Sequence, residues 1–221
     1  MHLYYIRHGE PDYEHNVLTE LGREEAETTS IELQKIHFDY IYSSSSNRAV
    51  QTASYLANKI NKPIIPLDWA KEETIFEEMG FYDEEVGFYH WIFHSKRMLK
   101  KMNELANDIN WYDDKAFLPT VKSGIERIKR NTDDWLKSLS IKHDFDKNRY
   151  FSNNQNDLTI AFFAHGGFGM AFISYILGMN YPYFVNHYNE HHTCGVTHIY
   201  IDETGKNPPQ LISYDVKFNR F

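Results

Sequence analysis

The sequence predicts an α/β fold, a three-layer α/β/α sandwich around a mostly parallel sheet. Short apolar runs typical of strands alternate with longer segments whose apolar residues repeat at helical spacing. One run, residues 158–164, is apolar nearly throughout, as expected for a strand covered by helices on both faces. The chain is long enough for one domain with a sizeable core, and no flexible linker divides residues 1–221.

The first third of the chain supplies three expected strands, residues 3–6, 40–43 and 63–67, and two helices. The first helix follows Thr19, whose hydroxyl suits an N-cap. The second follows a serine-rich turn and has Arg48 in its first turn, beside backbone N–H groups that are free to bind an anion. The apolar stripes are Ala26, Thr29, Leu33 and Ile36 in the first helix and Ala49, Ala53, Leu56, Ala57 and Ile60 in the second.

Residues 68–157 lose the alternation of strand and helix and become helical, aromatic and heavily charged, so we expect an insertion that lies over the site. Apolar spacing predicts one helix over residues 98–109 and another over 121–139, both with stripes that serve packing. Residues 144–157 contain turn formers without a sustained period, which indicates a surface loop.

The carboxyl-terminal part of the chain returns to strands. The strand at residues 158–164 leads to His165 and then to a helix that is expected to end at Gly178. Two further strands are predicted near the end of the chain, over residues 194–201 and 210–216.

Composition limits the class of function. With 23 Lys+Arg against 31 Asp+Glu the formal charge is -8, which argues against a nucleic-acid or anionic-membrane surface and requires any phosphate site to be a local cationic pocket. Cys194 is the sole cysteine, so an intramolecular disulfide and a cysteine-rich metal site are both excluded. Because no signal-like or membrane-spanning apolar run occurs, we expect a soluble cytoplasmic protein.

Three strand ends carry cationic or imidazole side chains. Arg7 and His8 follow the first strand, Arg48 follows the second, and His165 follows the strand at residues 158–164. Open α/β sheets bind ligands at the carboxyl ends of their strands. A guanidinium matches phosphate oxygens bidentately, and an imidazole is easily held as a neutral nucleophile near pH 7. The four side chains therefore predict a phosphate site.

In these segments the chain resembles the histidine phosphatase superfamily, also called the phosphoglycerate mutase-like family. That family has Arg-His-Gly near the start, Ser-Ser followed by Arg-Ala-x-Gln-Thr-Ala, and a late His-Gly. The matching segments, in order, are Arg7-His8-Gly9, Ser43 to Ala53 and His165-Gly166. The combination is far more specific than any one motif, and the family needs no metal or other cofactor.

The resemblance implies a reaction in two steps. His8 is the expected nucleophile and must start neutral; the neighbouring arginines disfavour its imidazolium form, and a backbone carbonyl near Gly9 could hold its other ring N–H. Arg7 and Arg48 are the expected phosphate clamps, and His165 is expected to donate a further hydrogen bond to the phosphoryl oxygens.

The family takes the proton for the leaving group from an acid, usually a Glu, just after the third strand. Glu72 is the first Glu after that strand and best matches the family's position. Glu73, Glu77 and Glu78 stand close by, and the sequence does not decide among the four because the donor must be the one in a partly closed site that raises its pKa.

Two positions depart from the family pattern. Pro11 stands where many members have Thr, and Glu14 replaces the Asn often found six residues beyond the His. The auxiliary phosphate contact of the family therefore lacks its usual residue. The sequence leaves open whether Asn16 substitutes, and Thr19 is the stand-in assigned to phosphate binding.

Two further clusters have alternative interpretations. His187 and His191 lie four residues apart beside Glu190, which is a metal-ligand pattern, but a loop at the mouth of the pocket is the preferred interpretation and no metal is expected. The aromatic cluster around Trp91 is interpreted as core of the insertion, with stacking on an organic group of the substrate as the alternative.

The sequence therefore predicts a metal-independent phosphomonoester hydrolase that acts on a small phosphorylated substrate. A phosphoglycerate mutase-type phosphotransferase is one alternative, which would need another cationic grip on the substrate carboxylate, with Lys96, Arg97, Lys100 and Lys101 unassigned. A catalytically silent interaction protein on the same fold is the other, although it would normally have lost one of the four cationic positions. The physiological substrate and the oligomeric state are not encoded in any recognisable pattern.

Overall fold

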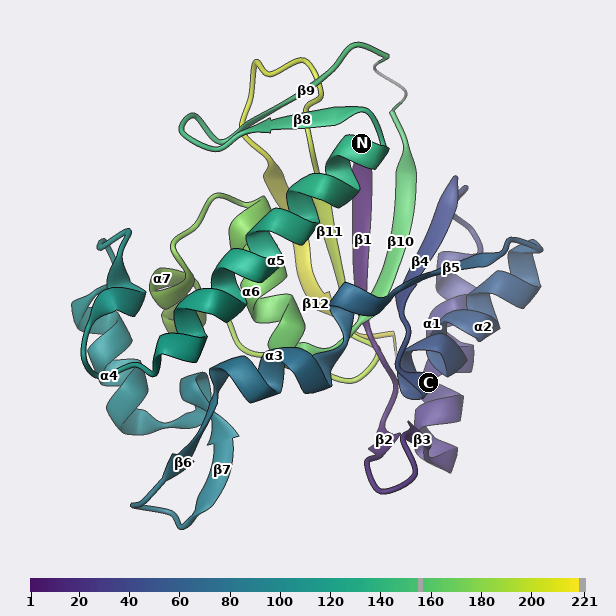
Figure 1. Cartoon of the computed structure of the whole chain (residues 1–221). Helices are drawn as coiled ribbons and strands as arrows, with labels where there is room; N and C mark the ends of the chain where they lie inside the picture. The colour runs from purple at the N-terminus through teal and green to yellow at the C-terminus, as the bar shows by residue number, and fades with distance from the viewer. Residues whose placement is uncertain (155–156, 219–221) are drawn as a thin grey trace.

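The computed structural model describes residues 1–154 and 157–218, and it contains a central six-stranded sheet (Figure 1). The strands, in spatial order, are β12 (Gln210–Val216), β11 (Val196–Tyr200), β1 (His2–Arg7), β10 (Thr159–Ala164), β4 (Tyr40–Ser44) and β5 (Ile64–Leu67). Strands β1, β10, β4 and β5 are parallel, whereas β11 and β12 run antiparallel at one edge. The predicted mostly parallel sheet is confirmed.

Helices cover both faces of the sheet, which gives the predicted three layers (Figure 1). One face packs on α1 (Glu20–Leu33) and α2 (Asn47–Ile60), where Ile6, Ile41 and Phe163 meet Leu33 and Leu56. The other face belongs to the main core with α5 (Pro119–Ser138), α6 (Gly166–Ile176) and α7 (Tyr181–His187). Side chains alternate between the faces along β1, so Leu3 and Tyr5 join the main core.

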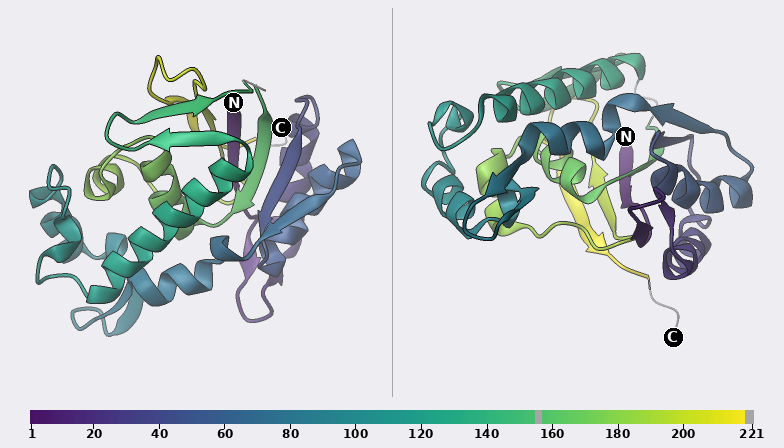
Figure 2. Two further views of the ribbon diagram at one scale, coloured as in Figure 1. Left: turned by 45° about the horizontal axis from the view of Figure 1, so that its top comes forward. Right: turned by 60° about the horizontal axis from the view of Figure 1, so that its bottom comes forward.

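The register of the parallel strands brings their carboxyl ends to one edge. Arg7 pairs with Ala164 across β1 and β10, and Phe163 pairs with Ser43 across β10 and β4. Residues that follow these strands therefore start from neighbouring points. This edge is the lower one in Figure 1, where the hairpin of β2 (Pro11–Asp12) and β3 (Val17–Leu18) and helix α3 (Glu72–Met79) also lie, and it faces the viewer in the right view of Figure 2.

Residues 68–157 contain helices and two small hairpins. The helices are η1 (Asp68–Ala70), α3, η2 (Ile92–His94), α4 (Lys96–Glu104), η3 (Trp111–Asp113) and α5. The hairpins are β6 (Gly80–Asp83) with β7 (Phe88–Trp91) and β8 (Ile141–Asp144) with β9 (Arg149–Ser152). The helix predicted over 121–139 is confirmed, but the one predicted over 98–109 ends at Glu104, and Ile109 is exposed.

The surface loop predicted for residues 144–157 is wrong in its first half, because the β8–β9 hairpin occupies it (Figure 2, left). The turn formers around Asn148, which has φ 46°, make the tip of that hairpin. Tyr150 is buried and stacks on His143 with the ring centres 4.4 Å apart. Packing therefore stabilises the hairpin, although its sequence lacks the alternation of apolar and polar residues that would predict strands. Residues 155–156 of the expected loop lie outside the described residues. No helix in the described ranges is long and apolar enough to cross a membrane.

Candidate active site

His8 follows β1 directly and is completely buried. Its Nδ1 lies 2.7 Å from the carbonyl oxygen of Gly9, and its Nε2 lies 3.3 Å from Nε of Arg48. A carbonyl can only accept and a guanidinium N–H can only donate, so Nδ1 carries the proton and Nε2 is unprotonated, with its lone pair accepting from Arg48. The expected carbonyl that fixes the tautomer is present.

The surroundings of His8 keep it neutral. Burial lowers the pKa of His8 to about 3, and the charges of Arg7 and Arg48 act in the same direction against the hydrogen bond to Gly9. A neutral imidazole with an unprotonated Nε2 is the form that can attack phosphorus.

Arg48 lies in the first turn of α2 and is buried. Its Nη1 donates to Asn16 Oδ1 at 2.7 Å and to Glu73 Oε1 at 2.8 Å, and its Nη2 lies 3.2 Å from Glu72 Oε2. Ser46 stands at the N-cap position but donates its hydroxyl to Glu73 instead of capping the helix. The guanidinium thus joins His8 to the acidic segment that follows β5.

Arg7 is the last residue of β1, and its partners come from the carboxyl-terminal part of the chain. Its Nη1 forms an ion pair of 3.3 Å with Glu190 Oε1 and donates to the carbonyl oxygen of His191. Glu190 also contacts His94 at 3.1 Å, so it lies between Arg7 and His94. The Nε atom of Arg7 is buried without a hydrogen-bond partner among the described residues, and it remains available to a ligand oxygen.

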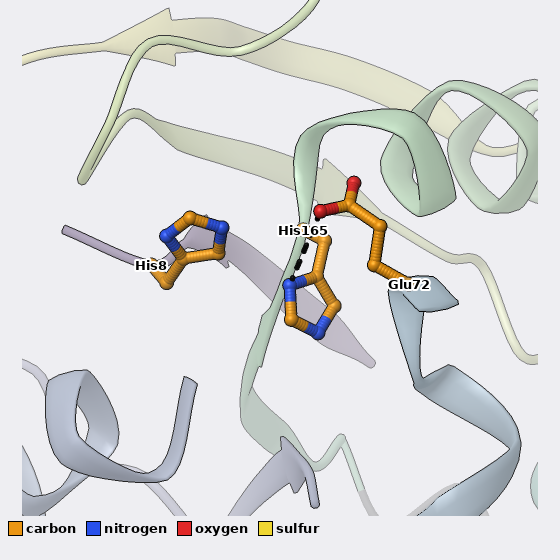
Figure 3. A group of neighbouring side chains, drawn as sticks. All are labelled: His8, Glu72 and His165. Carbon is orange, nitrogen blue, oxygen red and sulfur yellow. Dashed lines mark ion pairs between the residues drawn. The ribbon is translucent and has the colours of Figure 1, made fainter. Parts of the chain in front are cut away.

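His165 follows β10 and is completely buried, with its ring centre 5.1 Å from that of His8. Its Nε2 lies 2.8 Å from the hydroxyl of Ser44, and its Nδ1 lies 3.7 Å from Glu72 Oε2 (Figure 3). Burial and the nearby His8 and Arg48 hold the pKa of His165 well below its usual range. Ser44, which sequence reasoning did not single out, orients this ring.

Glu72 is the first residue of α3 and is the buried member of the four candidate acids. Its Oε1 accepts a hydrogen bond of 2.9 Å from the backbone N–H of Gly167, and its Oε2 faces Arg48 and His165. Burial raises the pKa of Glu72 despite the opposing charges of Arg48 and Arg7. A carboxyl group with a raised pKa is what a proton donor requires.

The other three acids differ from Glu72 in their surroundings. Glu73 is half exposed; its partial burial raises its pKa, but the hydrogen bond from Arg48 outweighs this and lowers the pKa of Glu73 on balance. Glu78 forms a bidentate pair with Arg127, at 2.8 and 2.7 Å, and Glu77 is exposed. Neither of these two contacts His8, Arg48 or His165.

The expectation that Thr19 binds phosphate is not met. Its hydroxyl accepts from the N–H of Gly22 as the N-cap of α1 and donates to Glu10 Oε2 at 2.9 Å, so both functions are used within the helix start. Asn16, in contrast, lies at the site: its Oδ1 accepts from Arg48, and its backbone is in the left-handed region with φ 53°.

A cleft of about 550 Å³ opens beside these residues. Its lining consists of Tyr13, Asn16, Arg48, Glu72, Glu73, Phe76 and Trp91. The part of the cleft next to Arg48 and Glu72 is polar, and the part formed by the aromatic residues is apolar. Sequence reasoning did not connect Tyr13 and Phe76 with the site, because no motif marks them.

Ligand atoms of His8, Glu72 and His165 lie within 4.8 Å of one another, which is the spacing of a metal site (Figure 3). Arg48 lies against two of these residues, however, and its fixed positive charge opposes a cation and favours an anion there. The pattern of His187 and His191 does not make a second metal site. His187 stacks on Tyr183 at the exposed end of α7, whereas His191 is buried and contacts Thr197 at 2.6 Å.

The comparisons with known proteins agree with this geometry. Residues 3–91 match the family model described as the histidine phosphatase superfamily, branch 1, and this range contains Arg7, His8, Arg48 and Glu72. The resemblance predicted from the motifs is thereby confirmed. A search of curated proteins found no match.

Solved structures with the same fold extend over the whole chain. A mycobacterial glucosyl-3-phosphoglycerate phosphatase is 17% identical, with 98% of this chain and 99% of that chain covered at a TM-score of 0.63. A phosphoserine phosphatase from Entamoeba histolytica, in complex with 3-phosphoglyceric acid, is 21% identical, with 98% and 97% covered at 0.61. A putative alpha-ribazole-5'-P phosphatase from Escherichia coli is 19% identical, with 98% and 96% covered at 0.63. At these identities the likeness establishes the fold, and the similar structures are phosphatases.

Proposed function

We propose that this chain is a metal-independent phosphomonoester hydrolase that works through a phosphohistidine on His8. The observation that carries the proposal is the pairing of a neutral imidazole with a protonatable carboxyl group around a cationic pocket. Nε2 of His8 is unprotonated and accepts a hydrogen bond from Arg48, and Glu72 is buried with a raised pKa a short distance away. Phosphoryl transfer needs these three elements: a nucleophile, fixed positive charge and a proton donor.

In the first step, Nε2 of His8 attacks the phosphorus atom and the bond to the leaving alkoxide breaks. Glu72 transfers its proton to that oxygen, so a neutral alcohol departs and Glu72 is left as a carboxylate. The proton stays on Nδ1, where it keeps its hydrogen bond to the Gly9 carbonyl, and the positive charge that develops is spread over the N-phosphoryl imidazole ring.

In the second step, the Glu72 carboxylate accepts a proton from water as the water oxygen attacks phosphorus. The P–N bond breaks, its electron pair returns to Nε2 of His8, and inorganic phosphate forms while Glu72 is again protonated. Arg7, Arg48 and Nδ1 of His165 would bind the equatorial oxygens in both steps. Nδ1 of His165 and Nε of Arg7 are buried without a hydrogen-bond partner among the described residues, which supports this role.

The mutase alternative needs a cation for the carboxylate of glycerate. The four candidate cations lie on or beside α4 away from the cleft lining: Lys96, Arg97 and Lys100 are exposed, and Lys101 pairs with Asp114 at 2.7 Å. The hydrolase is therefore the function that the site supports best.

Turnover of an aryl phosphate with and without a chelator tests the proposal. Phosphate release that the chelator does not change is the expected result, together with a labelled, acid-labile phosphohistidine in rapidly quenched samples. Chelator-sensitive turnover would contradict the metal-independent mechanism. Transfer that requires glycerate would favour the mutase, and a folded protein without turnover would favour the silent interaction protein.

A further inference from the structure

The cleft beside the phosphate site has an aromatic wall formed by Phe76 and Trp91. The two rings contact each other edge to face at a centroid distance of 5.0 Å, and Trp91 also stacks on Phe93 at 5.4 Å. Trp91 is only 9% exposed, so its ring is held in place by packing. Tyr13, on the β2–β3 hairpin and 65% exposed, adds a third ring to the lining.

This wall lies directly beside the proposed proton donor. The indole of Trp91 packs on the backbone of Gly167 so closely that a Cβ atom there would lie 2.3 Å from it. The N–H of the same Gly167 donates to Glu72 Oε1. Because the leaving oxygen must reach Glu72, the group attached to that oxygen would lie along Trp91 and Phe76.

The charges near the wall disfavour a second anionic group. Among the lining residues Arg48 is the only cation, and the phosphoryl group would use it. Arg7 is outside the lining and is paired with Glu190. Glu73 remains at the mouth as a carboxylate whose pKa is lowered, so a carboxylate on the leaving group would meet a like charge.

We propose that the preferred substrates carry a flat, uncharged, aromatic group on the alcohol side of the phosphoester, stacked on the wall of Phe76 and Trp91. This inference rests on the proposed hydrolase function and assigns its substrate class. Aromatic contacts prefer offset or edge-to-face geometry, which a flat ring can adopt against two rings that stand nearly perpendicular, at 73°.

Four monoesters test the substrate class: benzyl phosphate, cyclohexylmethyl phosphate, choline phosphate and 3-phosphoglycerate. All four leave as primary alcohols, so differences in kcat/KM report binding of the leaving group more than its chemical reactivity. Benzyl phosphate is expected to exceed cyclohexylmethyl phosphate about threefold to tenfold, the usual size of an aromatic pair contribution, and to exceed 3-phosphoglycerate by more than tenfold.

Variants connect the preference to the wall. Trp91→Leu is expected to remove the advantage of benzyl over cyclohexylmethyl phosphate, and Trp91→Phe is expected to retain most of it. Tyr89→Ala is a matched control, because Tyr89 is on the same hairpin strand, 66% exposed, and absent from the cleft lining. Glu73→Gln is expected to narrow the gap between 3-phosphoglycerate and benzyl phosphate.

The outcomes separate the two proposals. Turnover of all four esters with 3-phosphoglycerate or choline phosphate as the best substrate would overturn the aromatic class and leave the hydrolase intact. Equal turnover of benzyl and cyclohexylmethyl phosphate, unchanged in Trp91→Leu, would overturn the stacking. No turnover of any ester by folded protein would overturn the hydrolase and, with it, the substrate class.

Discussion

The Nε atom of Arg48 donates to Nε2 of His8 across 3.3 Å, while the far side of the His8 ring is tied to the Gly9 carbonyl at 2.7 Å. One imidazole is thus oriented from both nitrogens by groups whose hydrogen-bonding roles cannot be reversed. The nitrogen that faces Arg48 is the one that an incoming phosphoryl group would meet. This relationship makes His8 the first residue to test.

We expect His8→Ala to abolish turnover, by more than about a thousandfold, because no other group in the pocket supplies a neutral nitrogen in that position. The melting temperature should change little, since the lost contacts are two hydrogen bonds within a pocket that is rich in polar groups. Steady-state phosphate release and thermal unfolding measure the two effects. Turnover similar to that of the wild type would refute the assignment of the nucleophile.

The two neighbouring acids Glu72 and Glu73 provide a matched pair. Glu72→Gln should reduce kcat by roughly 10²–10⁴-fold for an alkyl phosphate and far less for p-nitrophenyl phosphate, whose leaving group needs no proton. Glu73→Gln should show no such dependence on the leaving group, because that carboxylate is half exposed and ionised. A leaving-group dependence found in Glu73→Gln instead of Glu72→Gln would transfer the role of the acid.

Activity is predicted to fall at both low and high pH, for a different residue on each side. His8 must be neutral, so activity is retained as pH falls until the pKa of His8, about 3, is reached, and it is lost below that value. Glu72 must be protonated, so activity is lost as pH rises through its raised pKa. The basic limb of log kcat against pH should therefore vanish in Glu72→Gln. Persistence of that limb in this variant would assign it to another group.

Loss of an arginine that binds the phosphate should strongly reduce kcat/KM. At about 4 Å and an effective dielectric of about 20, one charge pair contributes about 4 kcal/mol, which corresponds to roughly a thousandfold in rate before desolvation. Arg48→Ala should approach this loss in kcat/KM and raise the inhibition constant of inorganic phosphate, whereas Arg97→Ala, on the exposed side of α4, should change neither. Equal effects of the two substitutions would argue against a specific clamp.

Gly9 makes a close backbone contact that has no room for a side chain. A Cβ atom there would lie 2.3 Å from the carbonyl oxygen of Gly22, at the start of α1. Gly9→Ala should therefore lower the free energy of unfolding by at least about 3 kcal/mol, measured by denaturant titration. Gly87→Ala is the control: it has open space around it and a φ of 77°, so it should cost only about 1 kcal/mol. Similar costs at both positions would contradict the steric argument.

Much of the fold could be predicted from sequence because the strands of the sheet are continuous apolar runs. The strands that end at Arg7 and at Ala164 have the expected bounds within a residue or two, and so does α2. Helix α1 ends at Leu33, three residues before Ile36, the last residue of its expected apolar stripe. The hairpin at 141–152 could not be predicted, because its stability comes from packing of Tyr150 on His143 and on the core rather than from alternation along the strands. The organisation as a single domain with an insertion over residues 68–157 stays a prediction.

The candidate site was predictable where it consists of strand ends and unpredictable where it depends on side-chain orientation. Motif spacing brought Arg7, His8, Arg48 and His165 to one edge, but it could not choose Glu72 over Glu73, since adjacent helix residues differ by about 100° in direction. Thr19 was misassigned because an N-cap hydroxyl and a phosphate-binding hydroxyl look alike in sequence.

Helix α3 and the β6–β7 hairpin are consecutive, so a single stretch of chain, residues 72–91, contributes both Glu72 and Trp91. Any insertion or deletion within that stretch would shift the acid relative to the nucleophile at the same time as it reshaped the ring surface. A change in the length of this stretch would therefore alter the position of Glu72 and the choice of ester together. Efforts to redirect this chain to new esters should therefore begin with single substitutions on Phe76 and Tyr13, which leave the length of the stretch unaltered.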